Sequence, residues 1–269
     1  VIEFTSLQGV MGREYALRSG ESEEVAQGIY EHYLPRFAGD ALPTRRAAIV
    51  VGIADRLDSL AGLFAVGLTP TGSADPFGLR RAASGLVQLL AHDLLFRSPA
   101  DSAPPALIEL LRQAAEGLPV PASEESVREA WGFVVDRLRQ SLLSEGIRYD
   151  VADAVLAERA DFPRQALEAA RALNEWVARP DWPAILIAYA RCKRIVRPLR
   201  EEHPLSPERL TEPAAVALLR AYQEQREHVG RGVQQGNLEA LYEALRALTN
   251  PINVFFTDIL VMAEEPSVR

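Results

Sequence analysis

Apolar residues recur at steps of three and four through almost every segment of this 269-residue chain, and this spacing is the feature that most restricts its fold. A step of three or four returns to the same face of an α-helix, whereas a half-buried strand alternates at every second residue. Sustained strand alternation is absent from the sequence. The spacing therefore predicts an all-α protein, and the length allows two domains of ordinary size.

The first part of the chain predicts three helices. One covers about 22–34 and ends at Pro35, because proline cannot continue a helix. A second covers about 44–66. After a break rich in glycine and proline, Asp75 is predicted as the N-cap, and Pro76 as the first residue, of a third helix. The predicted inward face of the second helix comprises Val50, Ile53, Ala54, Leu57, Leu60, Ala61 and Phe64.

Two breaks in composition divide the sequence into three parts. The stretches "RSPADSAPP" and "GLPVPASEES" are rich in loop-forming residues, and Ser123 in the second stretch is a predicted helix N-cap. We therefore expect a first domain at 1–98, a helical connector at 99–149 and a second domain at 150–269. Amphipathic segments with short breaks between them fill the second domain, which favours helices packed antiparallel.

Charge and cysteine content restrict the partners and the compartment. Acidic residues outnumber Lys and Arg by 37 to 29, and the net charge of −8 gives no global attraction to nucleic acid or anionic lipid. A polyanion would need a local basic patch. Cys192 is the single cysteine, which excludes an internal disulfide and fits a reducing, cytoplasmic setting. Signal-peptide and membrane-span patterns are absent, so we expect a soluble protein with no membrane partner, cut from a longer chain.

A cationic segment lies in the second predicted domain, within the stretch "YARCKRIVRPLR". Its members are Arg191, Lys193, Arg194, Arg197 and Arg200, and no acidic residue lies among them. Arg191, Arg194 and Arg197 recur at every third residue, on one side of the predicted helix. Such a ridge suits the phosphates of a nucleic acid, because neutralising them releases counterions. Tyr189 or an exposed Trp182 would offer a surface for an unpaired base. The alternative is a solvated helix face balanced by Glu201 and Glu202, and the residues alone leave both open.

Two further cations, Arg80 and Arg81, follow "DPFGL" near the predicted start of the third helix. They lie off its apolar face, a position that suits contacts with an acidic partner or with RNA. The same position equally suits a structural role, in which these arginines hold the loop that contains Asp75.

His32 lies beside an acid, and Asp55 and Asp58 are three residues apart on the second predicted helix. Carboxylates and histidine are ligands for divalent metals that hydrolyse phosphate esters. The stretch "EHYLPRFAGDALPTRRAAIVVGIADRLDSL" resembles the later half of the HD phosphohydrolase superfamily, but the earlier His and His-Asp pair of that superfamily are missing. His32 and Asp55 alone would leave a metal under-coordinated, so we predict no bound metal, with these three residues as vestiges or solvated scaffold.

Four longer stretches carry a more specific resemblance: "EFTSLQGVMGREYAL", "EHYLPRFAGDALP", "ADRLDSLAGLFAVG" and "PTGSADPFGLRRAASG". Together they resemble the beta subunits of bacterial glycyl-tRNA synthetases of the heterotetrameric type, and specifically the C-terminal portion of that family. The resemblance implies an HD-like helical domain truncated at its N-terminus, a helical connector and a DALR-type anticodon-binding bundle. The closing motif of the family usually has aspartates where Asn253 and Thr257 stand here, so contacts at that end are expected to differ.

This resemblance implies a division of labour. The alpha subunit of an alpha2beta2 assembly would bind ATP, Mg and glycine, and the beta subunit would bind glycine-specific tRNA. We accordingly expect neither a catalytic centre nor a cofactor in this chain. The alternatives are a fragment of an HD-type metal-dependent phosphohydrolase, acting through His32, Asp55 and Asp58, and a purely structural module that docks the alpha subunit or a second copy.

Overall fold

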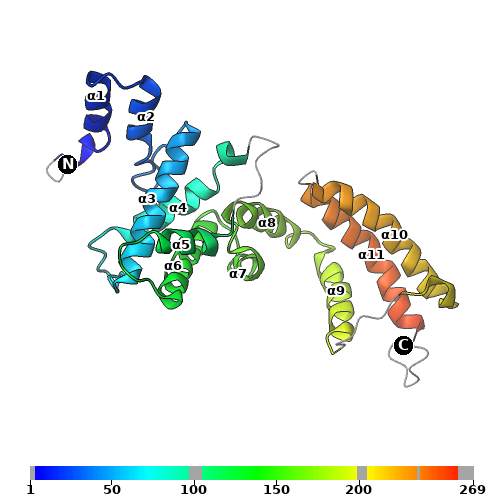
Figure 1. Ribbon diagram of the computed structural model, residues 1–269. Helices are drawn as coiled ribbons and strands as arrows, with labels where there is room; N and C mark the ends of the chain where they lie inside the picture. Colours follow the sequence, from blue (N-terminus) through cyan, green and yellow to red (C-terminus); the bar gives the residue numbers. More distant parts are fainter. Residues whose placement is uncertain (1–3, 97–104, 199–204, 235–236, 260–269) are drawn as a thin grey trace. The chain divides into compact units, whose positions relative to one another are not determined.

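The computed structural model describes residues 4–96, 105–198, 205–234 and 237–259. Within these ranges the chain forms eleven α-helices and three short 3-10 helices, and the only β pairing there is a bridge between Thr71 and Ala74. The prediction of an all-α fold is confirmed for the described residues (Figure 1).

The elements follow one another along the chain as a simple succession of helices. In order they are η1 (Thr5–Leu7), α1 (Val10–Arg18), α2 (Glu23–Glu31), α3 (Arg46–Ala65), α4 (Leu79–Leu90), η2 (Asp93–Phe96), α5 (Leu107–Glu116), α6 (Glu124–Ser144), α7 (Tyr149–Arg159), α8 (Pro163–Trp176), α9 (Trp182–Val196), η3 (Pro207–Arg209), α10 (Pro213–Gln234) and α11 (Leu238–Asp258). They divide into two compact units, Val1–Ala170 and Arg171–Arg269, and the division falls inside α8, beyond the predicted start of the second domain at 150.

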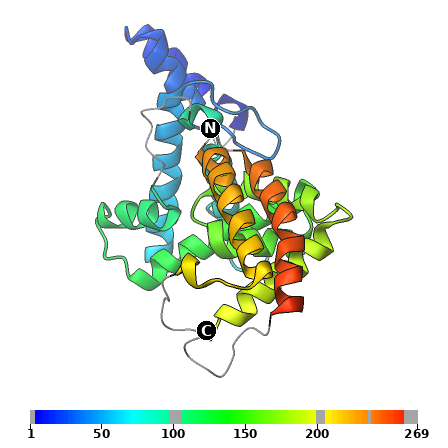
Figure 2. The ribbon, with the colours of Figure 1, turned by 90° about the vertical axis from the view of Figure 1, so that its right-hand side faces the viewer.

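In the first unit α3 is the central helix, and α4, α5 and α6 pack against it. Leucine is the most frequent residue of the core, which matches the apolar spacing of these helices. Side chains that are fully buried include Ile49, Leu60, Leu86, Leu89, Leu111, Val134 and Leu138. The pair formed by α1 and α2 joins this core through contacts between α2 and α3, and both ribbon views show the pair at the end where α3 begins (Figures 1 and 2).

The inward face of α3 differs from the predicted one in the first half of the helix. Ile49 and Gly52 are buried there, whereas Val50 and Ala54, which were predicted to face inward, are exposed. The prediction was wrong because residues 47–54 carry no polar side chain, so spacing alone cannot distinguish one face from another. In the second half, the predicted burial is confirmed for Leu57, Leu60, Ala61 and Phe64.

The start of α4 is also later than predicted. Its first helical residue is Leu79 rather than Pro76, and Gly78, with a left-handed backbone (φ +70°), occupies the N-cap position. The Asp75 carboxylate nevertheless accepts hydrogen bonds from the backbone N–H groups of Leu79 (2.8 Å) and Arg80 (3.0 Å). It therefore satisfies free donors of the first turn from a position before the helix.

The second unit is built around α11. α10 runs alongside it as an antiparallel partner, and α9 packs against it as well. The hydrophobic core of this unit contains Trp176, Ile185 and Tyr242, and the ring centres of Trp176 and Tyr242 lie 5.4 Å apart. Across the described ranges, no helix combines the length and apolar character that a membrane crossing requires.

Candidate nucleic-acid interface

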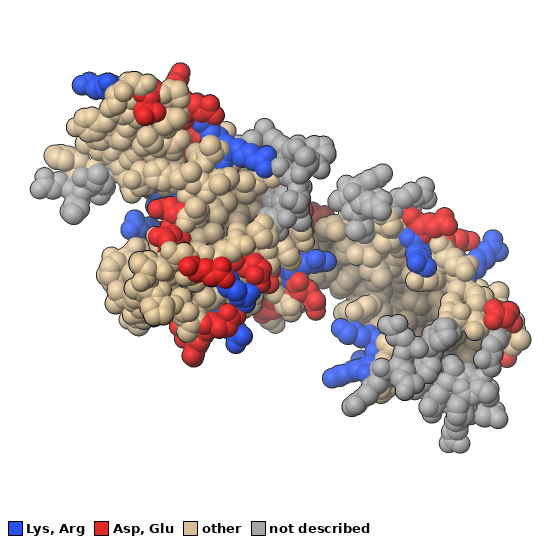
Figure 3. All heavy atoms as spheres, viewed as in Figure 1, with Lys and Arg blue, Asp and Glu red and all other residues tan. Residues whose placement is uncertain are grey.

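The cationic segment lies on α9, toward the C-terminal end of the helix. Pro183 near the start of α9 is tolerated because the first-turn N–H groups have no partner within a helix. Lys193 and Arg194 belong to the last turn and Arg197 is the C-cap residue, where positive charge is favourable to the helix dipole. Lys and Arg side chains gather over α9 in the space-filling view (Figure 3). Arg200 lies outside the described residues.

Arg191 does not share the exposed face of the other cations. A three-residue step falls short of a full helical turn by about 60°, so residues at this spacing drift around the axis. In this case Arg191 turns toward α11, where its Nη1 donates to Asn253 Oδ1 at 3.2 Å and its guanidinium lies 4.7 Å from the ring centre of Phe256. The three arginines therefore do not form one continuous exposed row.

Lys193, Arg194 and Arg197 are exposed, and none of the three forms an ion pair with a described residue. The counter-charges that the sequence offers, Glu201 and Glu202, lie outside the described residues. The Lys193 ammonium group lies 6.0 Å from the ring centre of Tyr189, and that residue is 50% exposed. The last turns of α9 thus present cations together with an accessible aromatic ring.

The first half of α9 has a different exposed surface. Leu186 and Ile187 are 48% and 59% exposed there, although both are large and apolar. The exposed side of the helix is therefore apolar at its start and cationic at its end. An unpaired stretch of RNA offers both chemistries, because its bases stack on apolar and aromatic groups while its phosphates attract cations.

A cluster of polar and aromatic side chains fixes the start of α9 to α11. The Tyr242 hydroxyl donates to the carboxylate of Asp181, the residue before α9. Arg179 donates through Nη1 and Nη2 to the Glu239 carboxylate, and its guanidinium lies 4.1 Å from the Tyr242 ring centre. Burial and the Asp181 carboxylate raise the pKa of Tyr242, so this hydroxyl stays a donor at neutral pH. Sequence analysis missed this cluster, since its members are far apart in the chain.

The two cations at the start of α4 have local contacts. Arg80 Nη2 donates to the carbonyl oxygen of Gly72 at 2.6 Å, and this bond helps to close the loop before the helix. The Arg81 guanidinium packs over Gly78, where an added Cβ would lie 2.9 Å from Nη2. These contacts support a structural role for Arg80, while Arg81 is exposed and available to a partner.

The vestigial metal candidates do not converge. Asp55 and Asp58 are both exposed on α3, and the ring of His32 lies 3.9 Å from that of Tyr33. Among the residues that the structure describes, no group of three or more His, Cys, Asp and Glu side chains is placed to hold a metal ion. The residue that follows Asp55, Arg56, points into the core instead.

Arg56 and Glu31 are buried charges that organise the loop between α2 and α3. Arg56 donates at 2.8–3.2 Å to five backbone carbonyl oxygens, those of His32, Tyr33, Leu34, Pro35 and Gly52. Glu31 accepts from the backbone N–H groups of Thr44 (2.8 Å) and Arg45 (3.0 Å), just before α3. Burial raises the pKa of Glu31, but the hydrogen bonds it accepts outweigh that effect and leave the pKa below its usual value. The acid beside His32 is therefore a structural anchor.

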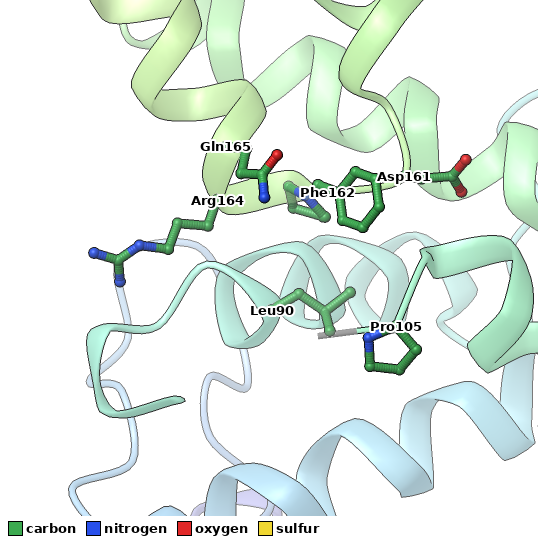
Figure 4. A pocket seen from close by; sticks show the side chains of 7 residues that line it. Leu90, Pro105, Asp161, Phe162, Arg164 and Gln165 are labelled. Carbon is green, nitrogen blue, oxygen red and sulfur yellow. The ribbon is translucent and has the colours of Figure 1, made fainter. Parts of the chain in front are cut away.

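Two cavities of the first unit, among the residues that the structure describes, are small or shallow. One of about 20 Å³, room for a single water, has the Asp161 carboxylate directed away from it (Figure 4). That carboxylate instead accepts from Ile108 N–H (3.1 Å) and Trp131 Nε1 (2.9 Å). An open depression of about 400 Å³ is lined by Phe64, Thr69, Pro70, Glu129, Gly132, Phe133 and Asp136. Neither combines depth with convergent polar groups, so α9 remains the candidate site.

Comparison with known proteins places this chain among synthetase sequences. The family described as "Glycyl-tRNA synthetase beta subunit" matches residues 1–157. The glycine–tRNA ligase beta subunit of Moorella thermoacetica is 41% identical over 100% of this chain, and that of Aromatoleum aromaticum is 40% identical over 99%. The chloroplastic/mitochondrial glycine–tRNA ligase 2 of Arabidopsis thaliana is 36% identical over 100% of the chain.

These relatives are all much longer than this chain. The 269 residues span 38% of the length of the two bacterial beta subunits and 24% of the Arabidopsis protein. The similarity extends along the whole of this chain, including α9 and the second unit.

Proposed function

The chain belongs to the glycyl-tRNA synthetase beta subunit family, and from this premise we propose that it is a tRNA-binding portion of a glycine–tRNA ligase. In this proposal it supports the ATP-dependent attachment of glycine to its tRNA in the cytoplasm. The alpha subunit of an alpha2beta2 assembly would bind ATP, Mg and glycine. No residue of this chain is assigned a bond-making role.

The proposal assigns a part to each region. Residues 1–98 would be the HD-like helical domain, 99–149 the connector, and 150–269 the DALR-type anticodon-binding bundle. The packing of α9 and α10 on α11 supports the last assignment, because such a bundle needs helices held on a common partner. The buried roles of Glu31 and Arg56 support an HD-like domain that serves as scaffold.

The observation that carries the proposal is the exposed cationic end of α9. Lys193, Arg194 and Arg197 lie free of ion pairs with described residues on a chain whose net charge is −8. Phosphates would neutralise these cations and release counterions, which drives binding without reading sequence. Tyr189, half exposed beside Lys193, is available for stacking an unpaired base.

Charge reversal tests this role. The double variant R194E/R197E should bind glycine-specific tRNA more weakly than the parent chain. Its log affinity should also fall less steeply with log salt, by about one for each phosphate that the variant no longer neutralises. R220E/R226E is the matched control, since it reverses the same number of charges at two exposed positions of α10 in the same unit. If R194E/R197E has the affinity and salt slope of R220E/R226E, α9 is not part of the proposed interface.

A second candidate function is docking of the alpha subunit through α9. The exposed side chains of Leu186 and Ile187 favour it, because protein interfaces are apolar at their centre. I187E should then abolish capture of the alpha subunit in the absence of RNA, and R194E/R197E should leave that capture intact. If I187E instead loses tRNA binding and still captures the alpha subunit, the result supports the first function alone.

A further inference from the structure

The first half of α3 is apolar on every side. Residues 47–54 read "AAIVVGIA", and Ile49 and Gly52 use one side of the helix to reach the core. On the other side, Val50 and Val51 are 52% and 53% exposed. A helix that is hydrophobic all round is normally buried all round. The side formed by Ala47, Val50, Val51 and Ala54, called here the outer face of α3, therefore has the composition of a covered surface.

More exposed apolar side chains occur at the same end of the first unit. Phe37, in the loop before α3, is 58% exposed. On α1, Met11 and Tyr15 lie one turn apart and are 38% and 63% exposed, although Ala16 of the same helix is buried. Both ribbon views place α1, α2 and the start of α3 at this end (Figures 1 and 2). These elements thus expose apolar side chains at the same end of the first unit as the outer face of α3.

The lengths of the relatives indicate the occupant. The Moorella thermoacetica beta subunit aligns with 100% of this chain, but the aligned region is only 38% of the length of that subunit. The corresponding helices therefore belong to a much longer chain in that protein. A covering segment in the same chain is held at high effective concentration and can dock on a small patch. The outer face itself, two alanines and two valines, is a smaller patch than the interface of a stable dimer, which buries about 1,200–2,000 Å².

We infer that the outer face of α3 is the docking surface for an apolar segment of the beta-subunit chain that lies outside these 269 residues. The absence of charge among Ala47, Val50, Val51 and Ala54 fits permanent packing within a chain. Asp55 and Asp58, exposed further along α3, mark where this apolar face gives way to a solvated one. The inference concerns assembly of the beta subunit and does not depend on tRNA binding by α9.

Photo-crosslinking in a full-length chain tests this inference. These 269 residues would replace the aligned region of the Moorella thermoacetica beta subunit, with p-benzoyl-phenylalanine at position 51. Val66 provides the control position, because it lies at the C-cap of the same helix and is 50% exposed. The probe at 51 should crosslink to the Moorella part of its own chain, and the probe at 66 should not. Crosslinks to a second copy, to the alpha subunit, or to nothing outside these residues would overturn the inference.

A charge variant gives an independent test. V51E should reduce protease resistance of the full-length chimaera roughly tenfold, since a carboxylate in an apolar contact must lose its hydration. The same variant should leave the protease resistance of the 269-residue chain unchanged, because Val51 is exposed there. V66E should change the protease resistance of neither protein. Equal effects of V51E and V66E in the chimaera, or an effect of V51E on the short chain, would contradict the docking surface.

Discussion

Arg56 places a charge in the core of the first unit without forming an ion pair with any described carboxylate. It is 6% exposed, and five backbone carbonyls accept its hydrogen bonds. Glycine makes room for it, since a Cβ at Gly85 would lie 2.7 Å from its Nε. The guanidinium thus replaces the hydration of a whole loop, a task that needs a planar group with several donors.

Replacing Arg56 should therefore be costly. R56M leaves buried carbonyls without a donor, and we expect the free energy of unfolding to fall by about 3 kcal/mol. R56K should lie between R56M and the parent, because an ammonium group keeps the charge but cannot reach five acceptors. Urea unfolding followed by circular dichroism gives these values. Equal midpoints for R56M and the parent would show that the loop does not depend on this side chain.

Asp40 makes the stability of the same loop sensitive to acid. The Arg36 guanidinium, which donates to it at 2.8 and 3.2 Å, lowers the pKa of Asp40 from 3.8 to about 2. Because the folded-state pKa is the lower one, this stabilisation is complete above pH 3.8 and is lost as the pH falls through about 2. D40N should cost about 1–2 kcal/mol at neutral pH and almost nothing near the lower pKa. D58N, which removes an exposed carboxylate, serves as control; a cost of D40N that persists in acid would rule out the ion pair as its cause.

At the scale of elements, a contact at the start of α9 fixes this helix to α11. The Tyr242 hydroxyl on α11 holds Asp181 immediately before α9. Y242F keeps the ring against Trp176 but removes this bond to a charged acceptor, and should lower the stability of the second unit by about 1.5–3 kcal/mol. Y222F is the matched control, because Tyr222 is 47% exposed on α10. Unfolding followed by tryptophan fluorescence would measure both, and similar midpoints for the two variants would exclude the proposed anchor.

Local signals predicted the helices well, whereas contacts between helices decided their faces. Ser123 accepts from the Ser126 N–H as the predicted N-cap of α6, because a cap needs only residues close in sequence. Arg191 was placed with the other cations, yet it turns to Asn253 and Phe256 on α11. The burial of Arg56 was not predicted either, since nothing in the spacing shows that five carbonyls surround it. Residues paired across the fold leave no periodic trace in the sequence.

At the scale of the whole molecule, contacts cluster into two units, and each has its own tryptophan reporter. Trp131 donates to Asp161 within the first unit, whereas Trp176 and Trp182 belong to the second, 6.5 Å apart between ring centres. The core of the first unit is rich in leucine, and that of the second contains a pair of packed aromatic rings. Cooperative unfolding extends only as far as such shared packing, so a single transition for the entire chain is not expected.

This separation predicts independent responses to substitution. R56M should lower the urea midpoint reported by Trp131 in a W176F/W182F background and leave the Trp176 and Trp182 signal of a W131F background unchanged. Y242F should do the reverse, because its contacts with Asp181, Arg179 and Trp176 all lie in the second unit. If both substitutions shift both signals by the same free energy, the chain unfolds as one cooperative body and the two cores depend on each other.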